Sequence, residues 1–167
     1  DKHDSSEDCV VAKVFLGLVF NPFVPANADG KFGLVKEFLR YFIYKKVDSL
    51  DFSNAEIVVK NKHSWFDPSQ DRTSPDVLIL FPGDTIMSFE AKYTLPLDKH
   101  DQLEREYIGL KKINQKVWHV NNEYLCLLIS HKRLFSHIQG RAKKGRGILR
   151  KCVNSCGNNF RVNTWNC

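Results

Sequence analysis

The feature that most constrains the fold is a pair of short apolar segments on either side of a turn. Residues 76–81 and residues 85–91 are rich in large apolar side chains, and Pro82-Gly83-Asp84 separates them. Pro, Gly and Asp together are typical of tight turns, and apolar runs of this length are typical of buried strands. The sequence therefore predicts an antiparallel β-hairpin, which is the strongest local signal in the chain.

The number of residues in the turn decides which side chains of the hairpin face each other. If the turn holds three residues, Asp76 at the start of the first strand faces Glu90 in the second. Opposed carboxylates repel unless a cation lies between them. Lys92 then shares the face of Glu90, and Ala91 leaves its backbone carbonyl as an oxygen ligand. A turn of two or four residues would instead pair Asp76 with Ala91.

Four further segments complete the expected fold. Residues 31–45 place apolar side chains at helical spacing, and residues 98–115 do so again, with Asp98 as the expected N-cap. Residues 55–60 are β-branched, and residues 124–129 form a continuous apolar run, which is typical of a central strand. The order is helix, three strands, helix, strand. We expect an α/β fold in which helices flank a central mixed sheet, and a helical crossover leads into the last strand.

Charge is distributed unevenly along the chain. Residues 1–100 carry 12 Lys and Arg against 15 Asp and Glu, a net of −3, whereas residues 101–167 carry 13 against 4, a net of +9. A phosphate polymer is the natural partner of such a basic surface, although a solvated basic tail has the same composition. The densest stretch, residues 140–151, has six basic residues and three Gly. The side chains expected to contact phosphates there are Arg141, Lys143, Lys144 and Arg146.

Length and cysteine content limit the architecture further. We expect a single domain over residues 1–167, with its core at about residues 31–130 and a basic extension at about residues 131–167. The longest nearly apolar run, residues 10–20, is too short to cross a bilayer, so no membrane partner is expected. Five cysteines are an odd number, which favours reduced thiols and a cytoplasmic or nuclear protein. Cys126 lies within an apolar run and is expected in the core.

Pro75-Asp76, thirteen further residues and Glu90-Ala91-Lys92 form a pattern that resembles the signature of the PD-(D/E)xK nuclease superfamily. This superfamily includes restriction endonucleases, Holliday-junction resolvases and RecB-like exonucleases. The resemblance covers residues 31–129. It implies a restriction-endonuclease-like core and a metal-dependent deoxyribonuclease, and it favours an endonuclease over an exonuclease. The sequence does not distinguish these two modes of cleavage, and it leaves a homodimer open. Two alternatives stay open: a hairpin whose rim bears a surface salt-bridge cluster, and a nucleic-acid-binding module that keeps the fold without the chemistry.

The resemblance also implies a role for each residue of the pattern. Asp76, Glu90 and the carbonyl of Ala91 would hold Mg²⁺, which Mn²⁺ can replace, because these cations prefer oxygen ligands. Lys92 would orient the attacking water or stabilise negative charge on the phosphorane. The catalytic set implied on the hairpin is therefore Asp76, Glu90 and Lys92.

An acidic residue on the first helix often completes the metal shell in this superfamily. Glu37 is the best-placed candidate, since it lies at the edge of the apolar stripe of residues 31–45. An ordinary surface glutamate paired with Arg40 or Lys36 is the alternative. Both interpretations of Glu37 stay open at this point.

A second resemblance lies on the helix that follows the hairpin. Gln102-Leu-Glu-Arg-Glu-Tyr107 resembles the RecB-like motif Q-x-x-x-Y, in which Gln and Tyr reach the active site, but one extra residue rotates Tyr107 by about 100° around the helix. We therefore expect Gln102 at the active site and Tyr107 in the core. The same helix offers Arg105, Lys111 and Lys112 for phosphate contacts, although basic helix residues usually just face solvent.

Some RecB-like nucleases hold an iron–sulfur cluster on one cysteine before and three after the nuclease motifs. Cys9, Cys152, Cys156 and Cys167 have that distribution. Their spacing departs from the usual one, and a structural zinc site would need a CxxC pair that the sequence lacks. We therefore expect these thiols to bind neither an iron–sulfur cluster nor zinc.

Overall fold

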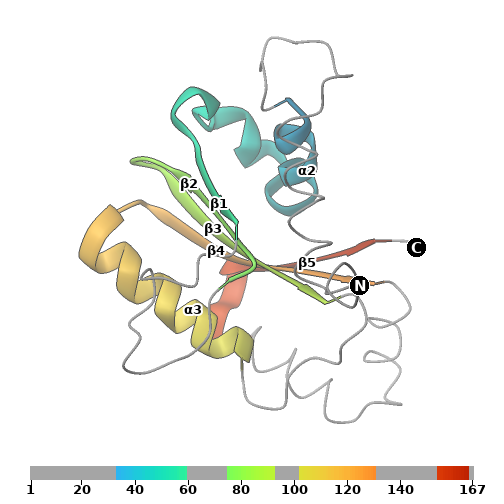
Figure 1. Cartoon of the computed structure of the whole chain (residues 1–167), viewed down its shortest axis with the longest axis vertical. Coiled ribbons are helices and arrows are strands. Elements are labelled where there is room, and N and C mark those ends of the chain that lie inside the picture. Colours follow the sequence, from blue (N-terminus) through green and yellow to red (C-terminus); the bar gives the residue numbers. More distant parts are fainter. Residues whose placement is uncertain (1–32, 60–74, 93–101, 131–153, 166–167) are drawn as a thin grey trace, which may run out of the picture.

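The computed structural model of the chain describes residues 33–59, 75–92, 102–130 and 154–165 (Figure 1). None of the helices within these ranges has the length and apolar character needed to span a bilayer. The elements follow the order that the sequence predicts, with one strand added at the end. In chain order they are α2 (Gly33–Ile43), η1 (Tyr44–Ser49), η2 (Phe52–Asn54), β1 (Glu56–Val59), β2 (Val77–Phe81), β3 (Thr85–Lys92), α3 (Gln102–Ile113), η3 (Asn114–Trp118), β4 (Asn122–Ser130), η4 (Gly157–Asn159) and β5 (Phe160–Trp165).

The five strands form one sheet in the order β1-β2-β3-β4-β5. The first three strands are antiparallel neighbours, whereas β3, β4 and β5 run parallel. The α/β class, the mixed sheet and the order helix, three strands, helix, strand are therefore confirmed. The fifth strand departs from the expectation, because β5 lies in the region assigned to a basic extension and joins the sheet beside β4.

The two helices α2 and α3 cover opposite faces of the sheet (Figure 1). The buried side chains of α2 cluster with Met87 and Phe89 on one face, and those of α3 cluster with Leu78 and Ile86 on the other. Side chains alternate along a strand, so odd-numbered residues of β2 and β3 face α2 and even-numbered residues face α3. This alternation decides which helix each polar residue at a strand end can reach.

Aromatic packing fixes α2 against its face of the sheet. The ring of Phe89 lies between those of Phe38 and Phe42, with centroid distances of 5.7 and 5.2 Å. The contact with Phe42 is edge to face, an arrangement that aromatic pairs favour. These contacts anchor β3 directly beside Glu90, which follows Phe89 in the sequence.

The hairpin turn contains three residues, which is the alternative that pairs Asp76 with Glu90. Phe81 pairs with Thr85 in the antiparallel register, and the N–H of Asp84 donates to the Phe81 carbonyl at 3.1 Å. Gly83 has a φ of 77°, a left-handed conformation that glycine adopts without steric cost. The turn chemistry therefore sets the register of the whole hairpin.

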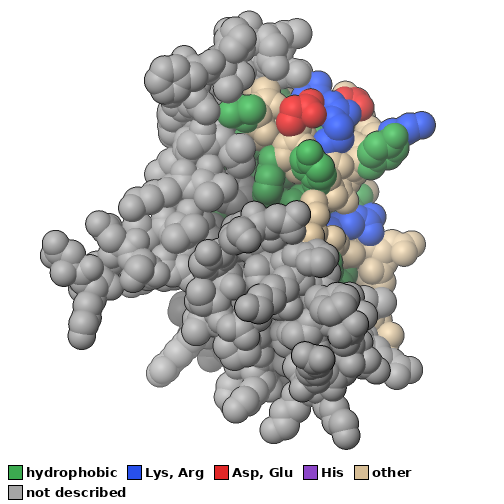
Figure 2. Space-filling model, turned by 90° about the vertical axis from the view of Figure 1, so that its right-hand side faces the viewer, with side chains coloured by type: hydrophobic (Ala, Val, Ile, Leu, Met, Phe, Trp, Pro, Cys, Tyr) green, Lys and Arg blue, Asp and Glu red, His purple; other side chains and the backbone are tan. Residues whose placement is uncertain are grey.

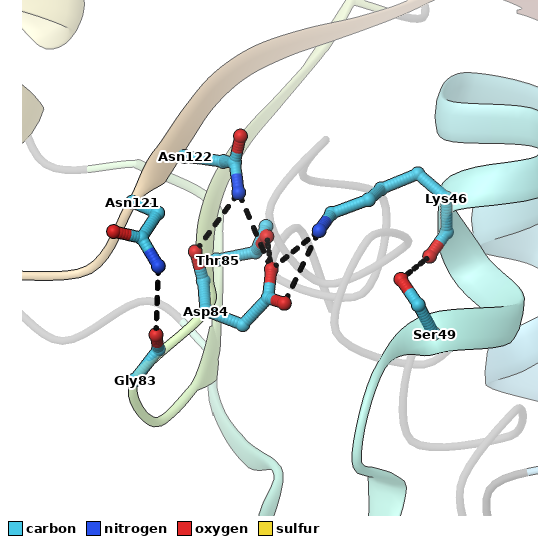
Figure 3. Close-up of polar contacts among 7 residues, drawn as sticks. All are labelled: Lys46, Ser49, Gly83, Asp84, Thr85, Asn121 and Asn122. Carbon is cyan, nitrogen blue, oxygen red and sulfur yellow. Dashed lines mark hydrogen bonds and ion pairs between the residues drawn. The ribbon is translucent and has the colours of Figure 1, made fainter.

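Polar contacts hold this turn against two neighbouring elements (Figure 3). The ammonium group of Lys46 in η1 lies 2.9 Å from Asp84 Oδ1, and the side-chain amide of Asn122 in β4 donates to the Asp84 carbonyl at 3.1 Å. Burial alone would raise the pKa of Asp84, but hydrogen bonds from Thr85 and Lys46 outweigh it and hold that pKa below its ordinary value. Asp84 is therefore charged at neutral pH and ties the turn to η1 and β4.

A buried amide fixes the connection from α3 to β4. Asn114 Oδ1 accepts the backbone N–H of Val120 at 2.8 Å, and Asn114 Nδ2 donates to the Val120 carbonyl at 3.1 Å. His119, between them, has a left-handed backbone with a φ of 51° and ends the helical segment η3. The chain thereby reverses, and β4 begins beside the turn end of β3 and runs parallel to it.

Candidate active site

Asp76 and Glu90 are neighbours across the hairpin. The ladder between β2 and β3 pairs Val77 with Phe89, which places Asp76 opposite Glu90 one residue further on. The backbone N–H of Ala91 donates to Asp76 Oδ2 at 2.8 Å, so the Asp76 carboxylate lies against the end of β3. Strand alternation puts both acidic residues on the face that α3 covers. The predicted cross-strand relationship is confirmed.

Gln102, the first residue of α3, contacts this pair from the helix. Glu90 is buried, with a relative exposure of 2%, and its Oε1 accepts a hydrogen bond from Gln102 Nε2 at 2.8 Å. The amide nitrogen of Gln102, and not its oxygen, faces Glu90, so its N–H donates and the carboxyl oxygen accepts. The expectation that Gln102 lies with the acidic pair is confirmed.

Glu106 is a member of the cluster that the sequence analysis missed. It lies one helical turn after Gln102, is fully buried at 0% exposure, and its Oε1 accepts from Gln102 Nε2 at 2.9 Å. Position 106 is where the motif Q-x-x-x-Y has its tyrosine. Spacing of four residues from Gln102 is the signal that could have found it, because residues i and i+4 share a helix face.

The structure places the other two residues of the sequence pattern at the end of β3. Ala91 is buried at 3% exposure among the side chains that face α2, so it points away from Glu90 as expected. Lys92 ends β3 and pairs with Ile129 of β4. That Lys92 shares the face of Glu90 stays a prediction from strand alternation. The Lys92 side chain lies outside the described part of the structure.

Glu37 does not join this cluster, and its expected role as a metal ligand is corrected here. Its side chain is 63% exposed, and its Oε1 lies 3.4 Å from Arg40, which also binds Asp48 at 2.9 Å. Helix α2 covers the opposite face of the sheet from Glu90. Figure 2, which looks onto this side of the molecule, shows acidic and basic side chains gathered together. Glu37 therefore belongs to a surface ion-pair network, the alternative that the sequence left open.

Tyr107 lies in the core, as predicted. It is buried at 5% exposure in the cluster that contains Leu103 and Leu110. Asn159 Nδ2 donates to its hydroxyl group at 3.1 Å, and burial raises the pKa of Tyr107 above the ordinary value. Tyr107 therefore joins α3 to η4 and packs on the sheet.

Three of the residues expected to contact phosphates lie on α3. Lys111 and Lys112 are exposed near its C-terminal end, and Arg105 is half-buried. The Lys111 ammonium group lies 5.5 Å from the centroid of the Tyr107 ring, within the range of a cation–π contact. The expected contacts in the basic stretch lie outside the described residues: Arg141, Lys143, Lys144 and Arg146.

The two described cysteines are both buried. Cys126 lies at the centre of the sheet, and burial raises the pKa of its thiol, so it stays neutral and packs as a core residue, as predicted. Cys156 is 5% exposed and packs in the same cluster as Phe160. Cys9, Cys152 and Cys167 lie outside the described residues, so the expectation that the cysteines bind neither a cluster nor zinc stays a prediction.

The chemistry of the donors at the hairpin end fits a hard divalent cation. Asp76 and Glu90 supply carboxylate oxygens and Ala91 supplies a backbone carbonyl, which are the ligand types that Mg²⁺ and Mn²⁺ prefer. Within the described ranges, no three His, Cys, Asp or Glu side chains already converge as a metal-binding group. Asp76 is instead bound to the Ala91 N–H and Glu90 to Gln102. The side chains would exchange these hydrogen bonds for metal ligation.

Comparisons of the chain with protein-family models, with curated proteins and with solved structures find no match. The functional interpretation therefore depends on the residues and on their geometry.

Proposed function

We propose that this protein is a metal-dependent nuclease that hydrolyses phosphodiester bonds in DNA, built on a restriction-endonuclease-like core. The observation that supports it best is the hairpin register, which brings Asp76 and Glu90 together at one strand end with a hydrogen bond of 2.8 Å from Ala91 to Asp76. A three-residue turn produces this pairing, whereas a turn of two or four residues would have separated the two carboxylates.

Each residue of the cluster has a role that its chemistry allows. Asp76, Glu90 and the Ala91 carbonyl would hold the cation, and Gln102 would orient Glu90 from the helix. A bound divalent cation would polarise the scissile phosphate and lower the pKa of a ligated water. Lys92, at the end of the same strand, would orient the attacking water and stabilise negative charge that develops on the phosphate.

The burial of the cluster indicates the side from which a substrate would approach. Glu90 and Glu106 are buried beneath α3, whereas Asp76 and Gln102 are half-buried. A phosphate group would therefore reach the cluster at the strand end where Asp76 and Gln102 meet solvent. Lys111 and Lys112 lie nine and ten residues after Gln102 on α3, so they would contact phosphates away from the scissile one, and the basic stretch of residues 140–151 would add further phosphate contacts.

The helix and strand order supports the restriction-endonuclease-like part of the proposal. An antiparallel hairpin carries the acidic pair, and α3 leads from β3 into a parallel neighbour, β4. This arrangement is the one that the resemblance to the PD-(D/E)xK superfamily implies. Strand β5 is an addition at the sheet edge beside β4.

A cleavage assay on the purified full chain separates this proposal from a binding module without chemistry. Supercoiled plasmid, linear duplex, single-stranded DNA and RNA would each be incubated with Mg²⁺, with Mn²⁺ or with EDTA. We expect cleavage of DNA that either cation supports and EDTA abolishes. Binding to DNA in all three conditions without cleavage in any of them would favour the module and contradict the nuclease.

A further inference from the structure

One amide nitrogen lies between two buried carboxylates at the start of α3. Gln102 Nε2 is 2.8 Å from Glu90 Oε1 and 2.9 Å from Glu106 Oε1. An amide nitrogen has two N–H groups, and here each carboxylate accepts one of them. Gln102 is therefore fully engaged on its nitrogen side, and the strand residue and the helix residue are joined through it.

Glu106 is the second buried acceptor of Gln102. It is fully buried, and its neighbours on α3, Leu103, Tyr107 and Leu110, pack in the apolar cluster on the same face of the sheet. Its position one turn after Gln102 brings the two side chains together along the helix axis. The carboxylate of Glu106 is thus a buried acceptor on the same helix, and its hydrogen bond favours the direction in which the Gln102 amide points.

The orientation of the Gln102 amide matters for Glu90. If the amide rotated by half a turn about its terminal torsion, its oxygen would face Glu90, and two acceptors would then repel. A second acceptor at Glu106 opposes that rotation, because both N–H groups are satisfied only in the observed orientation. The hydrogen bond from Gln102 in turn fixes the orientation of the Glu90 carboxylate group about its terminal torsion.

We propose that Glu106 is a positioning residue for the metal site: acting through Gln102, it holds the Glu90 carboxylate in the orientation that binds the cation. This inference rests on the proposed function, in which Glu90 is a metal ligand. Glu106 itself need not touch the cation. The motif Q-x-x-x-Y has a tyrosine at this position, so the motif itself does not supply this role for Glu106.

The measurement that tests it is Mn²⁺ affinity, by titration calorimetry on the folded full chain without nucleic acid. Replacing Glu106 by Gln keeps an acceptor oxygen of the same reach, so Glu106→Gln should bind Mn²⁺ within about threefold of the unsubstituted chain. Glu106→Met keeps the volume and removes the acceptor, and we expect it to weaken Mn²⁺ binding about tenfold. Glu106→Asp keeps the charge and shortens the reach, so it should weaken binding similarly and stands in if the Met variant does not fold.

A double-mutant cycle shows whether Glu106 acts through Gln102. Gln102→Met should weaken Mn²⁺ binding about as much as Glu106→Met, and the double variant should be no weaker than either single one. Losses that multiply in the double variant would overturn the inference, since Glu106 would then act independently of Gln102.

Ser88 supplies a matched control. It is fully buried on β3, on the same face as Glu90, and its Oγ has no hydrogen-bond partner among the described residues. Ser88→Ala should leave Mn²⁺ affinity unchanged. If the unsubstituted chain binds Mn²⁺ and Glu106→Met and Glu106→Asp both bind it equally well, the inference is wrong and the proposed function stands. If the unsubstituted chain neither binds Mn²⁺ nor cleaves DNA, the proposed function fails, and the inference fails with it.

Discussion

The backbone N–H of Ala91 donates a hydrogen bond to the Asp76 carboxylate across the hairpin, at 2.8 Å. This contact ties the residue that precedes β2 to the end of β3, one position from Glu90. It depends on the three-residue turn at the other end of the hairpin, because one residue more or less would move every partner to the opposite face. The turn therefore controls whether Asp76 and Glu90 meet.

Gly83→Ala should destabilise the protein, because Gly83 has a φ of 77° and a left-handed alanine costs about 1–2 kcal/mol. An added Cβ would meet no atom within 4 Å, so strain in the backbone is the whole expected effect. Gly157→Ala is the matched control, since Gly157 has a φ of 55° and equally open surroundings. Urea unfolding should show a similar loss of free energy for both variants. Only Gly83→Ala should also weaken Mn²⁺ binding. Equal Mn²⁺ affinity in the two variants would show that the conformation of the turn does not affect the acidic pair.

Asp84→Asn should remove a stabilising contribution that depends on pH. The pKa of Asp84 in the folded protein lies below its ordinary value of 3.8, so the folded state favours the charged form. This contribution is present above pH 3.8 and is lost as the pH falls through the lower folded pKa. Thermal unfolding from pH 7 to pH 2 should thus show the unsubstituted chain losing its advantage over Asp84→Asn in the acid range. A constant difference across that range would show that the charge of Asp84 is not what holds the turn.

Neutralising the basic stretch should weaken DNA binding without regard to sequence. A variant in which Arg141, Lys143, Lys144 and Arg146 are all replaced by Gln should have a flatter dependence of log affinity on log salt, by about 0.9 for each lost phosphate contact on duplex DNA. Fluorescence anisotropy with two unrelated duplexes at several salt concentrations would measure it, with EDTA present to prevent cleavage. An unchanged slope of log affinity against log salt would mean that residues 140–151 are a solvated basic segment that does not contact DNA.

Phe89→Ala should be among the most destabilising single substitutions in the hairpin. Phe89 is 2% exposed and packs between Phe38 and Phe42, so its truncation leaves a cavity and costs about 3–5 kcal/mol. Phe89→Leu, which fills most of that volume, should cost clearly less. Equilibrium unfolding in urea gives the loss in free energy of unfolding for each variant. Equal losses for Phe89→Ala and Phe89→Leu would contradict the cavity explanation.

The hairpin could be predicted from the sequence because local chemistry decides it, whereas its register depends on a turn length that the sequence left open and the structure supplied. Pro82-Gly83-Asp84 suits a tight turn with a positive φ at its Gly, and the apolar residues on either side alternate between two buried faces. The core positions of Cys126 and Tyr107 followed from the apolar residues around them in the sequence. These are cases in which neighbours along the chain are also neighbours in space.

Glu37, Glu106 and β5 depend on contacts that the sequence does not display. The apolar stripe of α2 predicts that the helix packs, but not on which face of the sheet, so Glu37 could not be excluded from the site. Glu106 lies among charged residues and is buried only because α3 docks on β3. Half of the residues of β5 are polar, and its pairing with β4 includes a contact of Arg161 with the Tyr124 ring at 5.4 Å.

The central claim is that Asp76 and Glu90 hold the cation needed for DNA hydrolysis and that Lys92 assists the attacking water. Single-turnover cleavage of plasmid DNA in Mg²⁺ by Asp76→Ala, Lys92→Ala and the control Glu37→Gln tests it most directly, with folding checked by circular dichroism. We expect the first two to lose at least about 100-fold in rate, and Glu37→Gln, on the opposite face of the sheet, to cleave within about twofold of the unsubstituted chain. Undiminished Mg²⁺-dependent cleavage by folded Asp76→Ala and Lys92→Ala would contradict the account.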